Sequence, residues 1–158
     1  LGEEAKGNEA YLKTQDQAVI ALANEMVGGA QCLLDSAIEY SKIRMQFGRT
    51  IGSFQAIKHK CADMLLELEL AKSAAYYAAA ALDDEGANIP ALASMAKSAA
   101  GDAYMHIAAE TIQIHGGIGF TWDQDTHLWF KRAKSSEVFF GDPAYHRERM
   151  VQHWGEGL

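Results

Sequence analysis

The stretch from Thr14 to Phe47 reads TQDQAVIALANEMVGGAQCLLDSAIEYSKIRMQF, and its large apolar residues recur at intervals of three and four positions. This spacing places them along one face of an α-helix. Thr14 and Gln17 form the pattern of a capping box, so we predict that the helix begins at Thr14. We expect it to run as far as Phe47 and to stop at Gly48. The apolar positions that carry this interpretation are Ile20, Leu22, Met26, Val27, Leu33, Leu34, Ile38 and Ile43.

Gly28 and Gly29 lie in the middle of this helical pattern. Glycine lowers the stability of a helix interior, because it loses more conformational freedom on folding than other residues. We therefore expect a close contact with another helix or with a ligand at this point.

Residues typical of helix starts and ends divide the next part of the chain into two further helices. Ser53 is placed to cap a second helix that runs to about Asp84, with Gly86 beyond its end. Pro90 suits the first turn of a third helix, which we expect to continue to about Ile114.

Residues 116–119, Gly-Gly-Ile-Gly, form a turn that a helix could not contain. Thr121 and Gln124 then repeat the capping-box pattern and predict a helix over 122–136. Asp142 followed by Pro143 is typical of a cap and a first helical position.

The last of these predicted helices is short and runs from Pro143 to about His153. We find no strand pattern of any length and no internal repeat. Four substantial helices and a short fifth, with brief connections, predict an all-α fold: an up-down four-helix bundle with a short additional C-terminal helix.

Composition narrows the functional classes. The 158 residues are 49% apolar, which suits one globular domain and excludes a disordered chain. A net charge of −7 without a basic stripe argues against nucleic acid binding. No apolar run is long enough to span a membrane, and no signal peptide is recognisable. Cys32 and Cys61 form no CxxC pattern, so we interpret them as reduced thiols in the core and expect a cytoplasmic protein.

Two motifs stand at predicted helix ends, and each has a structural and a functional interpretation. Arg44 precedes Phe47 and Gly48 at the end of the first helix, where an arginine complements the helix dipole or could grip a pyrophosphate. In the functional interpretation, Phe47 packs against a flat ring and Gln55 offers its amide to the same ligand. The glycine-rich segment 113–120 is either a simple turn or a place where the backbone approaches a bulky or negatively charged group.

Other chemical signatures are absent from the sequence or weak. The glycine segment does not follow a strand, so a dinucleotide-binding Rossmann unit is unsupported. The basic residues of 131–134 are explained by a solvated helix face. The histidines lack metal-ligand spacing, no helix carries the ExxH pattern of a di-iron bundle, and no nucleophilic triad is recognisable.

Four segments, taken in order and spacing, closely resemble the acyl-CoA dehydrogenase family: 43–48 (IRMQFG), 51–57 (IGSFQAI), 113–120 (QIHGGIGF) and 131–134 (KRAK). The resemblance extends from about Leu1 to Gln152. It implies that residues 14–154 are the family's C-terminal helical bundle. Residues 1–13 are then a linker from the N-terminal helical and middle β-domains, which are missing from this chain.

The resemblance also implies a cofactor, a substrate class and an assembly. Family members bind FAD at a subunit interface of a tetramer, which could here be a homo- or a hetero-tetramer, and they desaturate an acyl-CoA thioester. The electron acceptor is unspecified, and we expect the isolated chain to be inactive. A non-enzymatic helical interaction domain is the alternative. The resemblance implies FAD contacts from Arg44, Phe47, Phe54, Gln55, Gln113, Ile114, His115, Gly116 and Gly117.

The family's reaction requires a glutamate base in a dry pocket, and its usual positions are substituted here. One usual position aligns with Phe140, which stands in a Phe-Gly-Asp segment, and the other aligns with Ala18. Val19 replaces an arginine that often accompanies the second position. Phe140 cannot accept a proton, but its backbone N–H could polarise a thioester carbonyl, and we place Phe140 and Gly141 at the substrate.

Three hypotheses address the missing base. Glu25, two helical turns beyond Ala18 on roughly the same face, is a candidate base or else a buried glutamate paired across the bundle. In a second hypothesis, this chain belongs to the base-lacking subunit of a heteromeric dehydrogenase. In a third, Asp142 or Glu137 contributes, although Asp142 is also explained as a helix cap. We favour the heteromeric hypothesis, because the supporting arginine is lost together with the glutamate.

Overall fold

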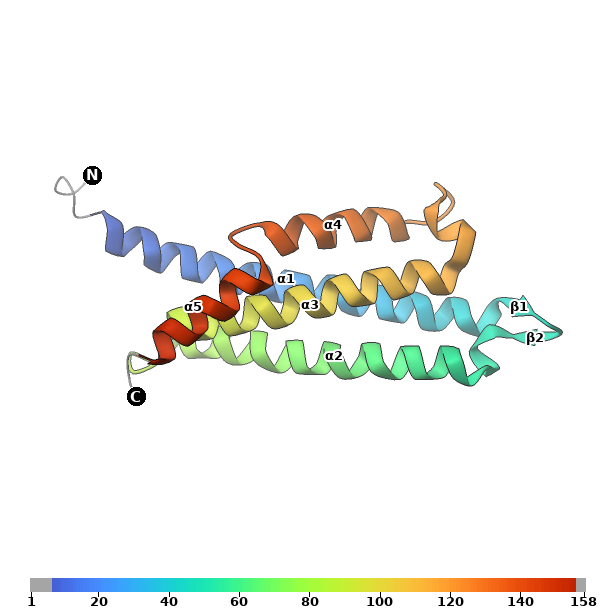
Figure 1. Cartoon of the computed structure of the whole chain (residues 1–158), viewed down its shortest axis with the longest axis horizontal. Helices are drawn as coiled ribbons and strands as arrows, with labels where there is room; N and C mark the ends of the chain where they lie inside the picture. The colour runs from blue at the N-terminus through green and yellow to red at the C-terminus, as the bar shows by residue number, and fades with distance from the viewer. Residues whose placement is uncertain (1–6, 156–158) are drawn as a thin grey trace.

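Residues 7–155 are described by the computed structural model, and most of them lie in long helices (Figure 1). Helix α3 occupies the centre and packs against each of the other helices. The all-α bundle predicted from the sequence is confirmed, with α4 and α5 together forming its bent fourth member. The helices are α1 (Asn8–Ile43), α2 (Gln55–Ala80), α3 (Ile89–His115), α4 (Thr126–Val138) and α5 (Pro143–Gly155).

Small side chains let these helices approach closely. Buried alanines follow one another along α3 and along the inner face of α2, and each is at most 1% exposed. Helices pack at the short end of the usual range when the side chains at their contact are small. The alanines of this seam are Ala93, Ala96, Ala100 and Ala108 on α3 and Ala71, Ala75 and Ala78 on α2.

The glycine pair of α1 makes the close helix contact that the sequence predicted. A Cβ atom on Gly29 would come within 2.5 Å of the Tyr104 hydroxyl oxygen on α3, so a larger residue there would displace the buried Tyr104 ring. That hydroxyl has no hydrogen-bond partner within residues 7–155, and burial raises the pKa of Tyr104 to about 12. Gly28 is exposed, and its Cβ would meet nothing within 4 Å.

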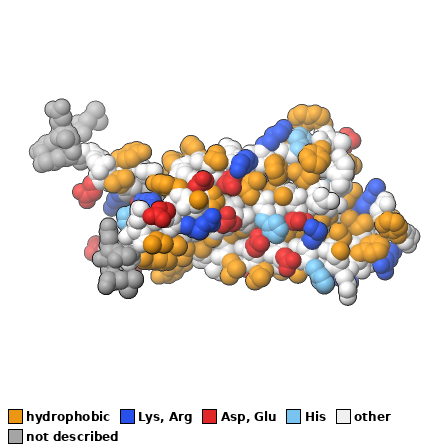
Figure 2. All heavy atoms as spheres, viewed as in Figure 1, with side chains coloured by type: hydrophobic (Ala, Val, Ile, Leu, Met, Phe, Trp, Pro, Cys, Tyr) orange, Lys and Arg blue, Asp and Glu red, His pale blue; other side chains and the backbone are white. Residues whose placement is uncertain are grey.

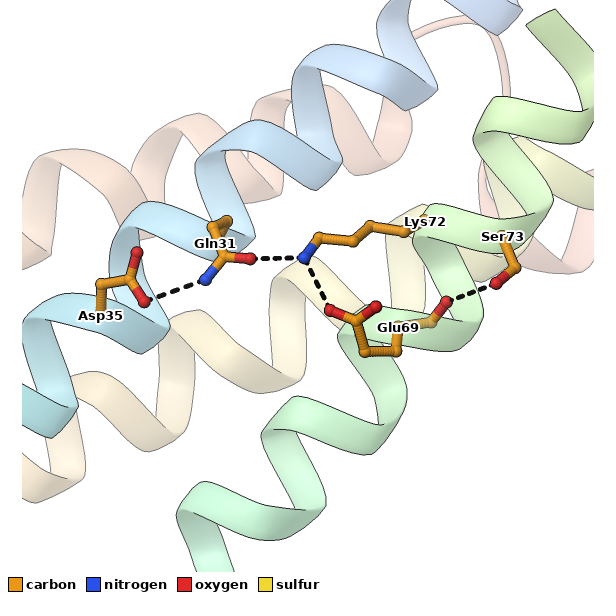
Figure 3. A network of polar contacts seen from close by, with 5 residues as sticks. All are labelled: Gln31, Asp35, Glu69, Lys72 and Ser73. Atoms are coloured by element: carbon orange, nitrogen blue, oxygen red, sulfur yellow. Dashed lines mark hydrogen bonds and ion pairs between the residues drawn. The ribbon is translucent and has the colours of Figure 1, made fainter. Parts of the chain in front are cut away.

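Polar side chains also tie α1 to α2 across the surface of the bundle (Figure 3). The Lys72 ammonium donates to Gln31 Oε1 at 2.5 Å and to Glu69 Oε1 at 2.6 Å. Gln31 in turn donates to Asp35 at 2.9 Å, while the Ser73 hydroxyl donates to the Glu69 carbonyl oxygen. Such exposed contacts fix the register of the two helices more than they stabilise the fold.

The first helix ends four residues earlier than predicted, because the chain turns into a small hairpin. Strands β1 (Met45–Gln46) and β2 (Arg49–Thr50) pair antiparallel, although no strand was expected from the sequence. Phe47 and Gly48 form the turn with φ of 52° and 77°. Positive φ at both central residues is the requirement of a two-residue hairpin turn, so Gly48 closes the hairpin and not the helix.

Three predicted helix starts are wrong, and one local interaction explains them. Helix α1 begins at Asn8, so the described part of the predicted linker is helical from Asn8 onward, while residues 1–6 lie outside the description. The hydroxyls of Thr14, Ser53 and Thr121 donate to carbonyl oxygens three or four residues earlier, at 2.7–2.8 Å. A hydroxyl bonded backwards in this way does not cap a following helix.

Two other predicted starts are confirmed. The Asn88 side chain caps α3 by accepting from Ala91 N, with Pro90 in the first turn. The Asp142 carboxylate accepts from Tyr145 N at 2.8 Å and caps α5. Within residues 7–155, none of the helices has the length and apolar character needed to cross a membrane.

Candidate functional site

The hairpin lies at one end of the bundle and presents three of the predicted cofactor residues to solvent (Figure 1). Arg44 follows the last residue of α1, and its backbone N–H donates to Tyr40 O at 2.9 Å. Phe47 is 91% exposed at the hairpin tip. Gln55, also exposed, is the first residue of α2. A cation, a flat apolar ring and an amide are therefore displayed together.

Phe54 is half-buried beside this group and is covered by a second arginine. Its ring meets that of Phe47 edge-on at 6.2 Å between centroids. The Arg49 guanidinium lies over the Phe54 ring, 3.9 Å from its centroid, a distance at which the ring attracts the cation. Sequence reasoning missed Arg49, whose signal was a second arginine two residues beyond Phe47.

The glycine segment follows α3 as a short helical turn over Gly116–Phe120. Gly116 has a φ of 68°, and a Cβ on Gly116 or Gly117 would meet nothing within 4 Å. A cavity of about 410 Å³ opens beside this turn. It is lined by Ala109, Ile112, Gln113, Gly116, Gly117, Phe120 and Phe130. The exposed backbone here is open to close approach by a ligand.

One stacked pair joins the hairpin end to the glycine turn. The Tyr40 ring lies on the His115 ring at 4.2 Å between centroids, with the planes inclined by 20°. The Tyr40 hydroxyl donates to His115 O at 3.5 Å, and His115 Nδ1 is bonded to Thr111 O at 2.8 Å. His115 and Ile114 are 5% and 6% exposed. Their side chains pack inward, so a contact of these two with a cofactor would come from the backbone.

These residues fit part of a flavin dinucleotide. Arg44 and Arg49 supply positive charge for phosphates, and Phe47 supplies an exposed face for a planar ring. Gln113 and Gly117 add an exposed amide and an open stretch of backbone. Within residues 7–155 no three histidine, cysteine or acidic side chains are arranged to hold a metal ion.

The other group of predicted site residues lies at the far end of α4, where Phe140 and Gly141 connect it to α5. Phe140 has a φ of 61° and Gly141 a φ of 108°. A Cβ on Gly141 would overlap the Tyr145 ring, so this position requires glycine. Helix α4, whose 13 residues span about 20 Å, lies between this turn and the end of the domain that carries the glycine turn. The hairpin-end residues and Phe140 therefore lie at two separate places on the domain.

Two buried basic side chains hold this turn, and sequence reasoning missed both. The Lys97 ammonium, from α3, donates to Glu137 O at 2.9 Å and to Gly141 O at 3.0 Å. His146, from α5, donates through Nε2 to Phe140 O at 3.1 Å. Burial lowers the pKa of Lys97, opposed by the charges of Glu137 and Asp142. The sequence signal for Lys97 was a polar residue on an otherwise apolar helix face, whereas the polar helix α5 offered no such signal for His146.

The two usual base positions come to the same level of the bundle. Helix α4 runs antiparallel to α1, and the Glu25–Arg132 ion pair ties the two helices together (Figure 1). Ala18 lies seven residues before Glu25, and Phe140 lies eight residues after Arg132. At 1.5 Å per helical residue, both are displaced by about 10–12 Å in the same direction. Both usual positions for the base thus lie at about the same level of the bundle, and both are apolar.

Glu25 itself is placed on the surface. Its carboxylate accepts from Arg132 Nε at 2.9 Å and from Nη2, and its side chain is 55% exposed. The predicted pairing across the bundle is present, but the burial is not. A base for carbon acids needs a dry pocket, and an exposed, arginine-paired carboxylate has none within the described residues.

The remaining acidic candidates have structural partners. Asp142 caps α5. Glu137 pairs through its carboxylate with Lys134, and its carbonyl oxygen accepts from Lys97. Both carboxylates are therefore explained by structural contacts, and neither contact indicates a catalytic base.

Comparison with known proteins identifies the fold by sequence as well as by shape. The family model "Acyl-CoA dehydrogenase, C-terminal domain" matches residues 5–154. The acyl-CoA dehydrogenase IpdE2 of Mycobacterium tuberculosis is 44% identical over 128 residues, which cover 81% of this chain and 38% of that protein.

Two solved structures give the same result. Butyryl-CoA dehydrogenase from Megasphaera elsdenii superposes with a TM-score of 0.91 at 32% identity, covering 96% of this chain and 39% of that one. A variant of the Tcur3481–Tcur3483 steroid ACAD superposes with a TM-score of 0.86 at 32% identity, covering 90% of this chain and 39% of that one. The chain spans about two fifths of the length of these proteins.

Proposed function

The chain belongs to the acyl-CoA dehydrogenase family, and we propose that it works as the C-terminal domain of an FAD-dependent enzyme that desaturates an acyl-CoA thioester. The observation that carries the proposal is the clustering of Arg44, Phe47 and Gln55 at the same end of the bundle as Gly116–Gly117. Bound FAD supplies the hydride acceptor in this chemistry, and the protein supplies binding and orientation.

At the hairpin end, we assign each residue a binding role. Arg44 neutralises the cofactor's pyrophosphate with a charge-assisted hydrogen bond, while Phe47 covers a planar ring. Gln55 and Gln113 contribute amide hydrogen bonds, and the backbone of 113–117 approaches the same cofactor. This assignment explains the presence of Arg44, Arg49 and the open glycine turn in a domain whose described residues contain no phosphate-binding loop fold.

At the far end, the backbone of Phe140 takes a role that its side chain cannot. Within residues 7–155 the Phe140 N–H makes no hydrogen bond. A donor in this state can bind the substrate's thioester carbonyl and stabilise the negative charge that develops when the neighbouring carbon loses its proton. We propose that these two ends, which α4 holds about 20 Å apart, contribute to two different flavin sites of an oligomer.

The source of the base is the second part of the proposal. Ala18 and Phe140 cannot accept a proton, and Glu25 is exposed and paired with Arg132. We therefore assign this chain to the base-lacking subunit of a heteromeric dehydrogenase, whose partner subunit supplies the glutamate. A solved relative named for two components, Tcur3481 and Tcur3483, is consistent with such an assembly. A homo-oligomer in which Glu25 is the base is the alternative.

The test uses the assembly as it is purified from its own cells. We expect it to be yellow, and we expect acyl-CoA added without oxygen to bleach the flavin absorption. A colourless assembly would instead support the non-enzymatic interaction domain, and a flavin that short, long and polycyclic acyl-CoA thioesters all leave oxidised would refute the proposal. The 158-residue chain alone should fold without retaining FAD, because it corresponds to only about two fifths of the length of its relatives.

A further inference from the structure

We propose that Lys97 and His146 are positioning residues that lock the Phe140–Gly141 turn, so that Phe140 N–H stays available to a substrate carbonyl. The lock follows from contacts within the chain, and only the identity of the acceptor rests on the proposed function.

The two side chains reach the turn from two different helices. Lys97 comes from the central helix α3 and His146 from α5, so three helices meet at the connection that Phe140 occupies. Lys97 is fully buried, and His146 is 1% exposed. A buried ammonium must be hydrogen-bonded, because an unpaired one is strongly disfavoured in an apolar interior.

The carbonyl groups on both sides of the Phe139–Phe140 peptide accept hydrogen bonds from within the domain. Lys97 donates hydrogen bonds to the carbonyl oxygens of Glu137 and Gly141, and His146 donates one to that of Phe140. The Val138 carbonyl oxygen accepts from Gly141 N at 3.2 Å. These contacts hold the peptide planes on either side of the Phe139–Phe140 peptide, whose own N–H makes no hydrogen bond among the described residues.

The backbone conformation of Phe140 explains why the turn needs to be held in place. Phe140 has a positive φ of 61°, which a bulky residue adopts only when its surroundings impose it. Two charged or polar donors that act on carbonyls on both sides of this residue supply such a constraint. Without them, the turn would relax to conformations that carry Phe140 N–H in other directions.

The experiment uses the full-length protein in its assembly and compares four variants. Lys97→Met and His146→Leu remove donors to the turn. His146→Gln is the conservative variant, because its amide can still donate to Phe140 O. Lys72→Met is the matched control, a lysine of α2 whose partners are Gln31 and Glu69.

Hydrogen–deuterium exchange is the first measurement. Phe139 N donates to Ser135 O and Gly141 N to Val138 O, so these amides report the closed turn. We expect them to exchange on the order of tenfold faster or more in Lys97→Met and His146→Leu, the effect of losing a charge-assisted or buried hydrogen bond. Exchange in His146→Gln and Lys72→Met should match the unsubstituted protein. If Lys97→Met folds and its turn amides exchange at the unsubstituted rate, the inference is wrong. If Lys97→Met does not fold, equal exchange rates of the turn amides in His146→Leu and His146→Gln would overturn the inference.

Flavin reduction by acyl-CoA is the second measurement. The rate constant at saturating substrate should fall roughly tenfold to a hundredfold in Lys97→Met, while FAD content stays the same, because the hairpin end is untouched. His146→Gln should recover the rate that His146→Leu loses. If no acyl-CoA reduces the unsubstituted enzyme, the proposed function fails, and the exchange measurement still decides whether the turn is locked.

Discussion

The ring of Tyr40 lies flat against that of His115, with centroids 4.2 Å apart and planes inclined by 20°. Tyr40 belongs to the last turns of α1, and His115 is the final residue of α3. The stack therefore couples the hairpin that carries Arg44 to the glycine turn at Gly116–Gly117.

Removing this stack should weaken FAD retention by the full-length assembly. Tyr40→Leu deletes an aromatic pair worth about 0.5–1.5 kcal/mol, which corresponds to roughly twofold to tenfold in affinity if the glycine turn loosens. Tyr40→Phe keeps the ring and loses only a long hydrogen bond of 3.5 Å, so it should behave like the unsubstituted protein. The flavin-to-protein ratio after competitive dilution measures both, and equal loss from the two variants would contradict the stacking account.

Replacing Arg44 should lower FAD affinity more than it lowers folding stability. Loss of a charge-assisted contact to phosphate costs about 1.5–3 kcal/mol, or roughly tenfold to a hundredfold in affinity. Lys42→Ala is the control, since Lys42 is an exposed neighbour paired with Glu39. Titration of the apo-assembly with FAD measures the effect. An Arg44→Ala variant that binds FAD as tightly as Lys42→Ala would refute the assignment.

His146 should make the domain less stable in mild acid. Burial, aided by the charge of Lys97, lowers the pKa of His146 to about 4. The unfolded chain takes up its proton near pH 6.5 and the folded one only near pH 4, so stability is full above 6.5 and declines towards 4. The largest loss is roughly 3 kcal/mol.

Urea unfolding of the chain between pH 7 and pH 4 measures this decline. His146→Gln should remove that share of the pH dependence, because glutamine does not titrate. His59→Gln, at an exposed histidine of α2, should leave it in place. Identical slopes for His146→Gln and the unsubstituted chain would show that the buried histidine contributes nothing.

The domain should associate through the outer face of α2. Leu66, Leu70 and Tyr77 are 62%, 63% and 61% exposed there, and hydrophobic side chains are visible along this edge of the molecule (Figure 2). A stripe of this kind marks an interaction surface. We expect oligomers of the chain at micromolar concentration, and monomers after Leu66→Glu with Leu70→Glu. Ala144→Glu, an exposed change on α5, is the control; a monomeric unsubstituted chain in sedimentation would contradict the prediction.

The sequence predicted the helices through periodicity and missed features that depend on tertiary contacts. Pro90 placed the start of α3 correctly, and the apolar spacing before Ile43 identified the middle of α1, because burial of one helix face decides both. Cys32, which we expected in the core, is exposed on α1. The hydroxyls of Thr14 and Thr121 bond backwards, and a capping pattern cannot reveal that choice.

The candidate site was predicted unevenly for the same reason. Arg44 and Phe47 belong to a continuous motif and could be selected from the sequence. Lys97 contacts residues that lie 40 and 44 positions further along the chain, and His146 folds back from α5 onto Phe140. Only the folded structure reveals these contacts. Glu25 could be assigned to the correct helix face, but its exposure and its partner Arg132 required the position of α4.

Flavin reduction by acyl-CoA in a homo-oligomer of the complete polypeptide, with and without Glu25→Gln, tests the central claim most directly. If this subunit binds FAD and leaves the base to a partner, the homo-oligomer should reduce its flavin slowly, and Glu25→Gln should change that rate by no more than a few-fold. Addition of the partner subunit should restore fast reduction in both. Fast reduction by the homo-oligomer alone, abolished by Glu25→Gln while flavin and acyl-CoA remain bound, would contradict the account.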